Sequence, residues 1–149
     1  MNRRGMTLIE LLVVLLIVGV LANIALPAMT IMVRKADATH VIGDFKAVRV
    51  AVFDYYATTS AYPASTNWGE VPAALRNELP QGFTFEYKGA QYRWQRYTLP
   101  DGMPSDPSQT VLLGLDVETS DTHLLQTIKN LYKGPLAFGT PTSVTLVIE

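Results

Sequence analysis

The chain begins with the longest apolar stretch in its sequence, and this stretch predicts a membrane-spanning helix. A short polar segment, residues 1–5, comes first. From Leu11 through Val33 there follow 23 residues without a charged side chain. At about 1.5 Å per residue they would form a helix of roughly 35 Å, long enough to cross a hydrocarbon core of about 30 Å. One acidic residue, Glu10, stands immediately before this stretch.

The residues after Val33 change to an amphipathic pattern that continues the same helix. Polar and charged side chains appear from Arg34 onward, and apolar residues recur at spacings of three and four. Such spacing places apolar side chains in one stripe, which a sheet or another helix must cover. We predict a single helix over about Met6–Ala57, ending before Tyr62-Pro63, against which a globular head packs. The stripe consists of Val41, Phe45, Val48, Val52 and either Tyr55 or Tyr56.

The remaining sequence predicts a small head, so that the whole chain is of the α+β class with a mainly antiparallel sheet. Aromatic and threonine residues flank a Lys-Gly-Ala turn at 88–90, which is typical of a β-hairpin. Ser120 or Asp121 is suited to cap a late helix, and Gly134 is suited to end it. The predicted strands are Phe83–Tyr87, Gln91–Leu99, Thr110–Val117 and Ser143–Ile148, and the predicted helices of the head are a short one from Pro72 to Leu79 and a later one at Thr122–Lys133.

Composition removes several classes of function. The formal net charge is −1 and the basic residues are scattered, so no patch predicts nucleic-acid binding. The absence of cysteine excludes disulfide bonds and thiolate metal sites. The two histidines, His40 and His123, belong to no HExxH motif, and the sequence has no phosphate-binding glycine loop and no GxSxG motif. We therefore predict that the chain is not an enzyme.

Gly19, Asn23 and Pro27 interrupt the apolar half of the helix at spacings of four. Pro27 lacks a backbone donor and its ring clashes with the carbonyl group of Asn23. Such residues are tolerated in membrane helices but weaken or kink a helix in water. The sequence leaves two interpretations open: a simple kink at Pro27, or local melting near residues 22–28 when the helix leaves the lipid.

A secretory signal peptide is a further interpretation of the N-terminus, because Arg3 and Arg4 precede an apolar stretch. The stretch is longer than the apolar region of about 7–15 residues in a signal peptide. Glu10 also stands at its start, and the stretch continues directly into the amphipathic half of the helix. These features disfavour ordinary secretion. A single-span membrane anchor that carries a binding module remains an alternative.

The motif Gly5-Met6-Thr7-Leu8-Ile9-Glu10, followed by the apolar stretch, resembles the N-terminal signature of the superfamily of type IV pilins and type II secretion pseudopilins. Pro27 and the Tyr62-Pro63 turn resemble features of the same superfamily. The resemblance implies that a prepilin peptidase cuts between Gly5 and Met6 and methylates the new amino terminus of Met6. Met6 stands where phenylalanine is usual. Glu10 would become the fifth residue of the mature chain, where the superfamily has its glutamate.

The resemblance also implies that the chain divides into three segments with different locations. These are a cleaved leader at 1–5, a transmembrane and filament-core segment at 6–33, and the amphipathic half of the helix with the head at 34–149. Arg3 and Arg4 would hold the N-terminus in the cytoplasm. The chain would then cross the inner membrane once and carry a periplasmic head. Expected partners are further copies or other pilin-like subunits, the prepilin peptidase and an inner-membrane assembly platform.

Glu10 carries the most specific hypothesis that the resemblance supports. Cleavage gives Met6 a free amine, and Glu10 of one subunit would meet the amine of a neighbour in the filament. An ion pair is strongly preferred to two unpaired charges where the dielectric constant is low. The alternative is an intrachain role, in which the carboxylate stabilises the positive end of its own helix dipole.

Two machines fit the resemblance. The length, the Tyr62-Pro63 turn and the absence of a C-terminal disulfide favour a pseudopilin of a type II secretion system, which supports protein secretion. The alternative is a type IV pilin or minor pilin for adhesion, motility or DNA uptake. Discriminating between them needs information from outside the sequence pattern.

Calcium is the one metal that the resemblance brings into consideration. Some secretion pseudopilins bind calcium through C-terminal loops, and calcium takes oxygen ligands. The spacing of the acidic residues matches no calcium motif, so we expect solvated carboxylates and no cofactor. The weak candidates for calcium ligands are Asp101, Asp106, Asp116 and Glu118.

Overall fold

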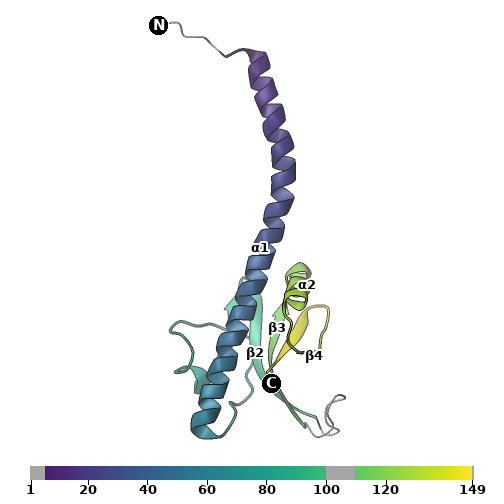
Figure 1. The fold of residues 1–149 in the computed structure, drawn as a ribbon. Helices are drawn as coiled ribbons and strands as arrows, with labels where there is room; N and C mark the ends of the chain where they lie inside the picture. Colours follow the sequence, from purple (N-terminus) through teal and green to yellow (C-terminus); the bar gives the residue numbers. More distant parts are fainter. Residues whose placement is uncertain (1–5, 100–109, 149) are drawn as a thin grey trace.

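The computed structural model describes residues 6–99 and 110–148. Its dominant element is helix α1 (Leu8–Thr59), a continuous helix of 52 residues, or about 78 Å at 1.5 Å per residue. The N-terminal half projects away from the rest of the molecule, and the C-terminal half packs against the head (Figure 1). The prediction of one long helix with an amphipathic second half is confirmed.

The C-terminal end of α1 is closed by the segment that the sequence analysis singled out as a turn. Ser60 adopts a left-handed conformation (φ 54°), and its N–H donates to the carbonyl oxygen of Tyr56 at 2.7 Å. The rings of Tyr56 and Tyr62 then stack with 4.5 Å between their centroids. The indole N–H of Trp94 donates to the carbonyl oxygen of Pro63 at 3.0 Å. The Tyr-Pro turn therefore reverses the chain and fastens it to the sheet.

The head is built on a five-stranded antiparallel sheet with the strand order β1-β2-β3-β5-β4. β1 and β2 form the predicted hairpin, and Lys88 (φ 46°) and Gly89 (φ 79°) both have positive φ, as a two-residue type I′ turn requires. Helix α2 follows β3 and packs beside α1 (Figure 1). The elements of the head are β1 (Glu86–Tyr87), β2 (Ala90–Thr98), β3 (Val111–Thr119), α2 (Thr122–Leu131), β4 (Leu136–Ala137) and β5 (Ser143–Ile148).

The core lies between the apolar stripe of α1 and one face of the sheet. Ala38 and Ala51 join the predicted stripe as fully buried residues. Trp94 and Tyr92 alternate with exposed or half-buried neighbours on β2 and are fully buried. Burial of aromatic and branched side chains supplies most of the stabilisation of such a head. The buried residues of α1 are Ala38, Val41, Phe45, Val48, Ala51 and Val52.

Several boundaries differ from the sequence-based expectations. The predicted helix from Pro72 to Leu79 is only a 3-10 turn at Ala73–Leu75, whose leucine, like Leu79, is buried in the core. Phe83–Phe85 is not strand. α2 ends at Leu131 with Tyr132 as its C-terminal cap, so Gly134 does not end it. β4 was not expected, since two apolar residues after Gly134-Pro135 carry no periodic signal.

Candidate functional site

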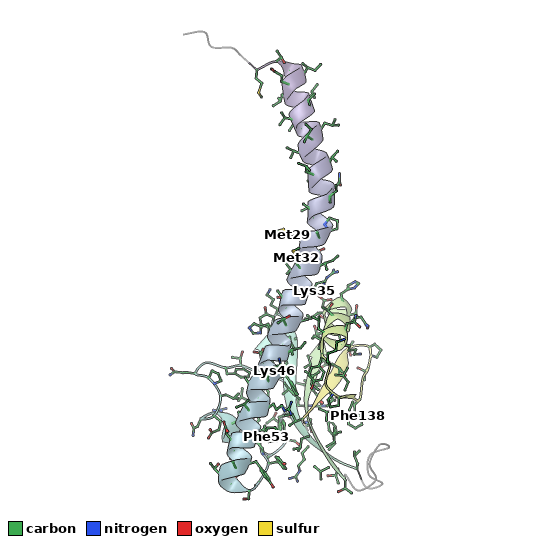
Figure 2. The ribbon with its side chains drawn as sticks, viewed as in Figure 1. Met29, Met32, Lys35, Lys46, Phe53 and Phe138 are labelled. Carbon is green, nitrogen blue, oxygen red and sulfur yellow. The ribbon has the colours of Figure 1, made fainter. Side chains whose placement is uncertain are left out.

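The N-terminal half of α1 has almost no cover within the described chain. Its large apolar side chains between Leu8 and Val33 are 46% to 76% exposed. By length and composition, this helix alone among the described residues is suited to span a membrane. Figure 2 shows Met29 and Met32 on this uncovered part of the helix, above the head. An apolar surface of this length requires lipid or other subunits around it.

Thr7 and Glu10 form a reciprocal cap at the start of α1. The Glu10 carboxylate accepts from the Thr7 N–H at 2.7 Å and from the Thr7 hydroxyl at 2.8 Å. The Thr7 hydroxyl oxygen accepts from the Glu10 N–H at 3.3 Å. This arrangement is a capping box, and it satisfies two donors that a helix start leaves open. Thr7 was missed by the sequence analysis, although its spacing from Glu10 is the signal for such a box.

The cap occupies only one oxygen atom of the Glu10 carboxylate. Both bonds from Thr7 end on Oε2, and within the described chain Oε1 accepts no hydrogen bond. The intrachain role that the sequence left open is therefore present in the single chain. It is compatible with a second bond from a neighbouring subunit, because a carboxylate accepts several hydrogen bonds.

Of the expected cleavage site, Gly5 lies outside the described residues and Met6 is the first described residue. Met6 precedes the helix and its side chain is 67% exposed. Its backbone is not part of the regular hydrogen bonding of α1, which begins at Leu8. Cleavage before Met6 therefore stays a prediction.

Gly19 and Pro27 lie within unbroken helix. The Asn23 amide donates to the carbonyl oxygen of Gly19 at 3.0 Å, and the Thr30 hydroxyl donates to that of Pro27 at 2.8 Å. These bonds give two carbonyl oxygens on the turns around the proline a side-chain donor. The single chain therefore keeps its helix through Pro27, and melting in an assembled state stays a prediction.

The candidate calcium ligands do not form one group. Asp101 and Asp106 lie outside the described residues. Asp116 was expected to be solvated, and this was wrong: it points from β3 into a polar cluster and is only 3% exposed. It accepts from Arg93 at 2.6 Å, Tyr97 at 2.6 Å and Thr145 at 2.6 Å.

Glu118 stands two residues further along β3 and is half-buried, outside this cluster. Across the described ranges, no three histidine, aspartate or glutamate side chains gather as a metal site would require. The carboxylate of Asp116 has its oxygens engaged by protein donors, which explains its burial without a cation. Asp121 has the capping role that was expected, and accepts from the N–H groups of His123 and Leu124.

A polar junction between α1 and the hairpin was not foreseen from the sequence. Asp37 accepts from the Lys88 ammonium at 2.8 Å and from the Tyr87 hydroxyl at 2.9 Å. The hydrogen bond from Lys88 lowers the pKa of Asp37 below its ordinary value of 3.8. The ring of His40 stacks on Tyr87 with 3.9 Å between centroids. These contacts join the hairpin to α1.

Comparison with known proteins places these features in context. Residues 1–26 match the family model described as "Prokaryotic N-terminal methylation motif". The type II secretion system core protein G of Escherichia coli K12 is 31% identical over 106 residues, which cover 71% of this chain and 67% of that protein. The corresponding protein of Klebsiella pneumoniae is 38% identical over 64 residues, 43% of this chain and 46% of that protein.

A type IV major alpha-pilin of Moraxella bovis is 46% identical over 50 residues, 34% of this chain and 31% of that protein. Apart from the Escherichia coli protein, the chain therefore spans about a third to a half of the length of these relatives. No solved structure matches the chain.

Proposed function

Because this chain belongs to the superfamily of type IV pilins and type II secretion pseudopilins, we propose that it is a filament subunit of the pseudopilin kind, which supports protein secretion. The observation that carries the choice of machine is the extent of the similarity. The match to core protein G of Escherichia coli covers 106 residues and must include much of the head. The match to the Moraxella bovis pilin covers 50 residues.

The route to the filament begins in the membrane. The apolar half of α1 holds the subunit in the bilayer, with the N-terminus in the cytoplasm and the head in the periplasm. A prepilin peptidase cuts between Gly5 and Met6 and methylates Met6. An assembly platform in the inner membrane then moves the subunit into the growing filament, next to further copies or other pilin-like subunits.

In the filament, protein contacts replace lipid contacts around α1. Lipid is as apolar as the helix, so the gain comes from close packing and polar pairing rather than from removal of water. The uncovered surface extends to the second half of the helix, where Val50 and Phe53 are 59% and 38% exposed. Neighbouring subunits supply the missing cover.

Glu10 sets the axial register in this scheme. Its Oε2 atom is held by Thr7, and its Oε1 atom accepts from the amine of Met6 in a neighbouring subunit. A carboxylate at the edge of a bilayer is costly without a partner. Pairing with the amine removes that cost, so the correct register is favoured over others.

A deletion strain tests the choice of machine. We expect loss of the chain to leave secreted proteins in the periplasm while pilus-dependent motility and DNA uptake are unchanged. The opposite result would assign the chain to a type IV pilus. A strain with both phenotypes normal and a chain that keeps residues 1–5 would leave only a membrane-anchored binding module.

A further inference from the structure

A groove of about 260 Å³ lies between α1 and α2. Ile31, Arg34 and Lys35 line it from α1, and His123, Gln126 and Asn130 are among its lining residues on α2. Figure 2 shows Lys35 at the upper margin of the head, where the free part of the helix begins. The groove is therefore the part of the head closest to the membrane-spanning segment.

The position of the groove along α1 places it at the surface of a bilayer. The uncharged stretch ends at Val33, so Arg34 and Lys35 are the first cations after about 35 Å of apolar helix. A hydrocarbon core is about 30 Å thick and the headgroup layers bring the total to about 40–45 Å. With the stretch in the core, both cations lie at the level of the lipid phosphates.

The cations of the groove have no carboxylate partner. No aspartate or glutamate lines the groove, and within the described chain neither Arg34 nor Lys35 forms an ion pair. The closest acid along α1, Asp37, is already paired with Lys88. Both cationic side chains are exposed. The groove therefore carries an excess of positive charge at the membrane surface.

The lining of the groove contains both apolar and polar side chains. Ile31 belongs to the apolar stretch and Leu131 is an apolar residue at the end of α2. Gln126 and Asn130 provide amide groups on the exposed side of α2, linked to each other by a bond of 3.3 Å. Exposed apolar side chains next to cationic and amide groups match the join between the acyl chains and the headgroup of a phospholipid.

We propose that this groove binds the headgroup of an anionic phospholipid, with Arg34 and Lys35 on the phosphate and the amides of α2 on the headgroup. The inference rests on the proposed insertion of α1 in the membrane. Binding would hold α2 and the head against the bilayer before assembly. It would also have to be broken when the subunit is extracted.

The test uses the full chain in nanodiscs that contain equal amounts of phosphatidylglycerol and phosphatidylcholine. Native mass spectrometry gives the ratio of the two lipids bound to the chain. We expect phosphatidylglycerol to be preferred, and Arg34→Gln with Lys35→Gln to reduce the preference on the order of tenfold. The control, Lys46→Gln with Arg49→Gln, removes the same charge from α1 away from the groove and should keep the preference.

A variant that changes no charged residue distinguishes binding in the groove from a general attraction of anionic lipid to the cations of α1. Gln126→Ala with Asn130→Ala keeps every cation, and we expect it to weaken the preference severalfold and to speed amide hydrogen exchange in residues 122–131. An unchanged preference in this variant, or an equal loss in the control pair, would overturn the groove as a binding site.

Two other outcomes would also contradict the proposal. A chain that enters the nanodiscs but binds both lipids equally would overturn this inference alone. A chain that fails to enter them would overturn the membrane placement as well. If the Arg34 and Lys35 variants bind lipid normally but no longer form filaments, the groove is a contact between subunits instead.

Discussion

The Tyr92 hydroxyl of β2 donates a 2.9 Å hydrogen bond to the Asp44 carboxylate of α1. The tyrosine ring is fully buried, and the same carboxylate oxygen lies 3.1 Å from Nδ1 of His40. Burial, and then the charge of Asp44, raises the pKa of Tyr92 above its ordinary value. The hydroxyl therefore stays protonated over the whole physiological range, and its hydrogen bond joins β2 to α1.

Tyr92→Phe removes the bond and keeps the ring. We expect a loss of about 1–2 kcal/mol in the free energy of unfolding of the head, because a bond to a charged acceptor is lost while Asp44 keeps some access to water. Urea unfolding of the full chain in detergent, monitored by tryptophan fluorescence, measures this loss in the free energy of unfolding.

Tyr56→Phe is the matched control, since Tyr56 stacks on Tyr62 and its hydroxyl has no bond within the described chain. Its effect should stay within about 0.5 kcal/mol. Equal effects of the two substitutions would show that the Tyr92–Asp44 bond contributes nothing beyond solvation of the hydroxyl.

Asp116 joins side chains of β2 and β5, and its removal leaves the donor groups of three side chains without their acceptor. Asp116→Ala should cost about 2–3 kcal/mol, less than a fully buried ion pair because Arg93 keeps partial access to water. Glu118→Ala, on the same strand but outside the cluster, should cost less than about 0.5 kcal/mol. Thermal unfolding by circular dichroism compares them, and a Glu118 variant as damaging as the Asp116 variant would refute this assignment.

The Asp37–Lys88 pair should make the stability of the head depend on pH at both extremes. The hydrogen bond from Lys88 lowers the pKa of Asp37 below 3.8, and the bond from Asp37 raises the pKa of Lys88 above 10.5. The contribution of the pair is therefore fully present between these values. It is lost as pH falls through the lowered pKa of Asp37, or rises through the raised pKa of Lys88.

The melting temperature of Asp37→Asn should accordingly fall below that of the natural chain between pH 3.8 and pH 10.5, and the difference should shrink as the pH falls below or rises above this range. Asp54→Asn is the control, because Asp54 is an exposed acid on the same helix without an ion pair in the described chain. A difference for Asp37→Asn that does not shrink as the pH is lowered below 3.8 would mean that the charge of Asp37 is not what stabilises the junction.

Local sequence patterns predicted those structural features that depend only on residues close together in the chain. Val41, Phe45, Val48 and Val52 follow the helical period, so the buried face of α1 was predictable. Lys88-Gly89 has the chemistry of a tight turn, so the hairpin was predictable as well. β4 was not, because Leu136–Ala137 is a strand only through its pairing with β5.

Polar pairs between distant segments could not be predicted either, because they also depend on how the segments pack. Arg93 and Asp116 face each other because β2 and β3 pair in one register, and a register shifted by one residue would place them on opposite faces. Asp37 meets Lys88 only when the hairpin is folded onto α1. The groove at Arg34 and Lys35 likewise depends on where α2 packs, which no spacing along the chain specifies.

The central claim concerns Glu10, and its two roles are separable. Thr7→Val removes the two cap bonds that the Thr7 hydroxyl makes and leaves only the bond from the Thr7 N–H, with the carboxylate still available, whereas Glu10→Ala removes both roles. If the carboxylate serves mainly as an intrachain cap, both variants should behave alike. If it pairs with a neighbouring amine, the Thr7 variant should assemble nearly as well as the natural chain.

The most direct measurement is the yield of filaments sheared from cells that express the chain together with a prepilin peptidase. We predict that Glu10→Ala is cleaved after Gly5 and inserted in the membrane like the natural chain but yields few or no filaments, while Thr7→Val yields nearly normal amounts. Normal filaments from Glu10→Ala, or a natural chain that keeps its first five residues and stays monomeric, would contradict the account.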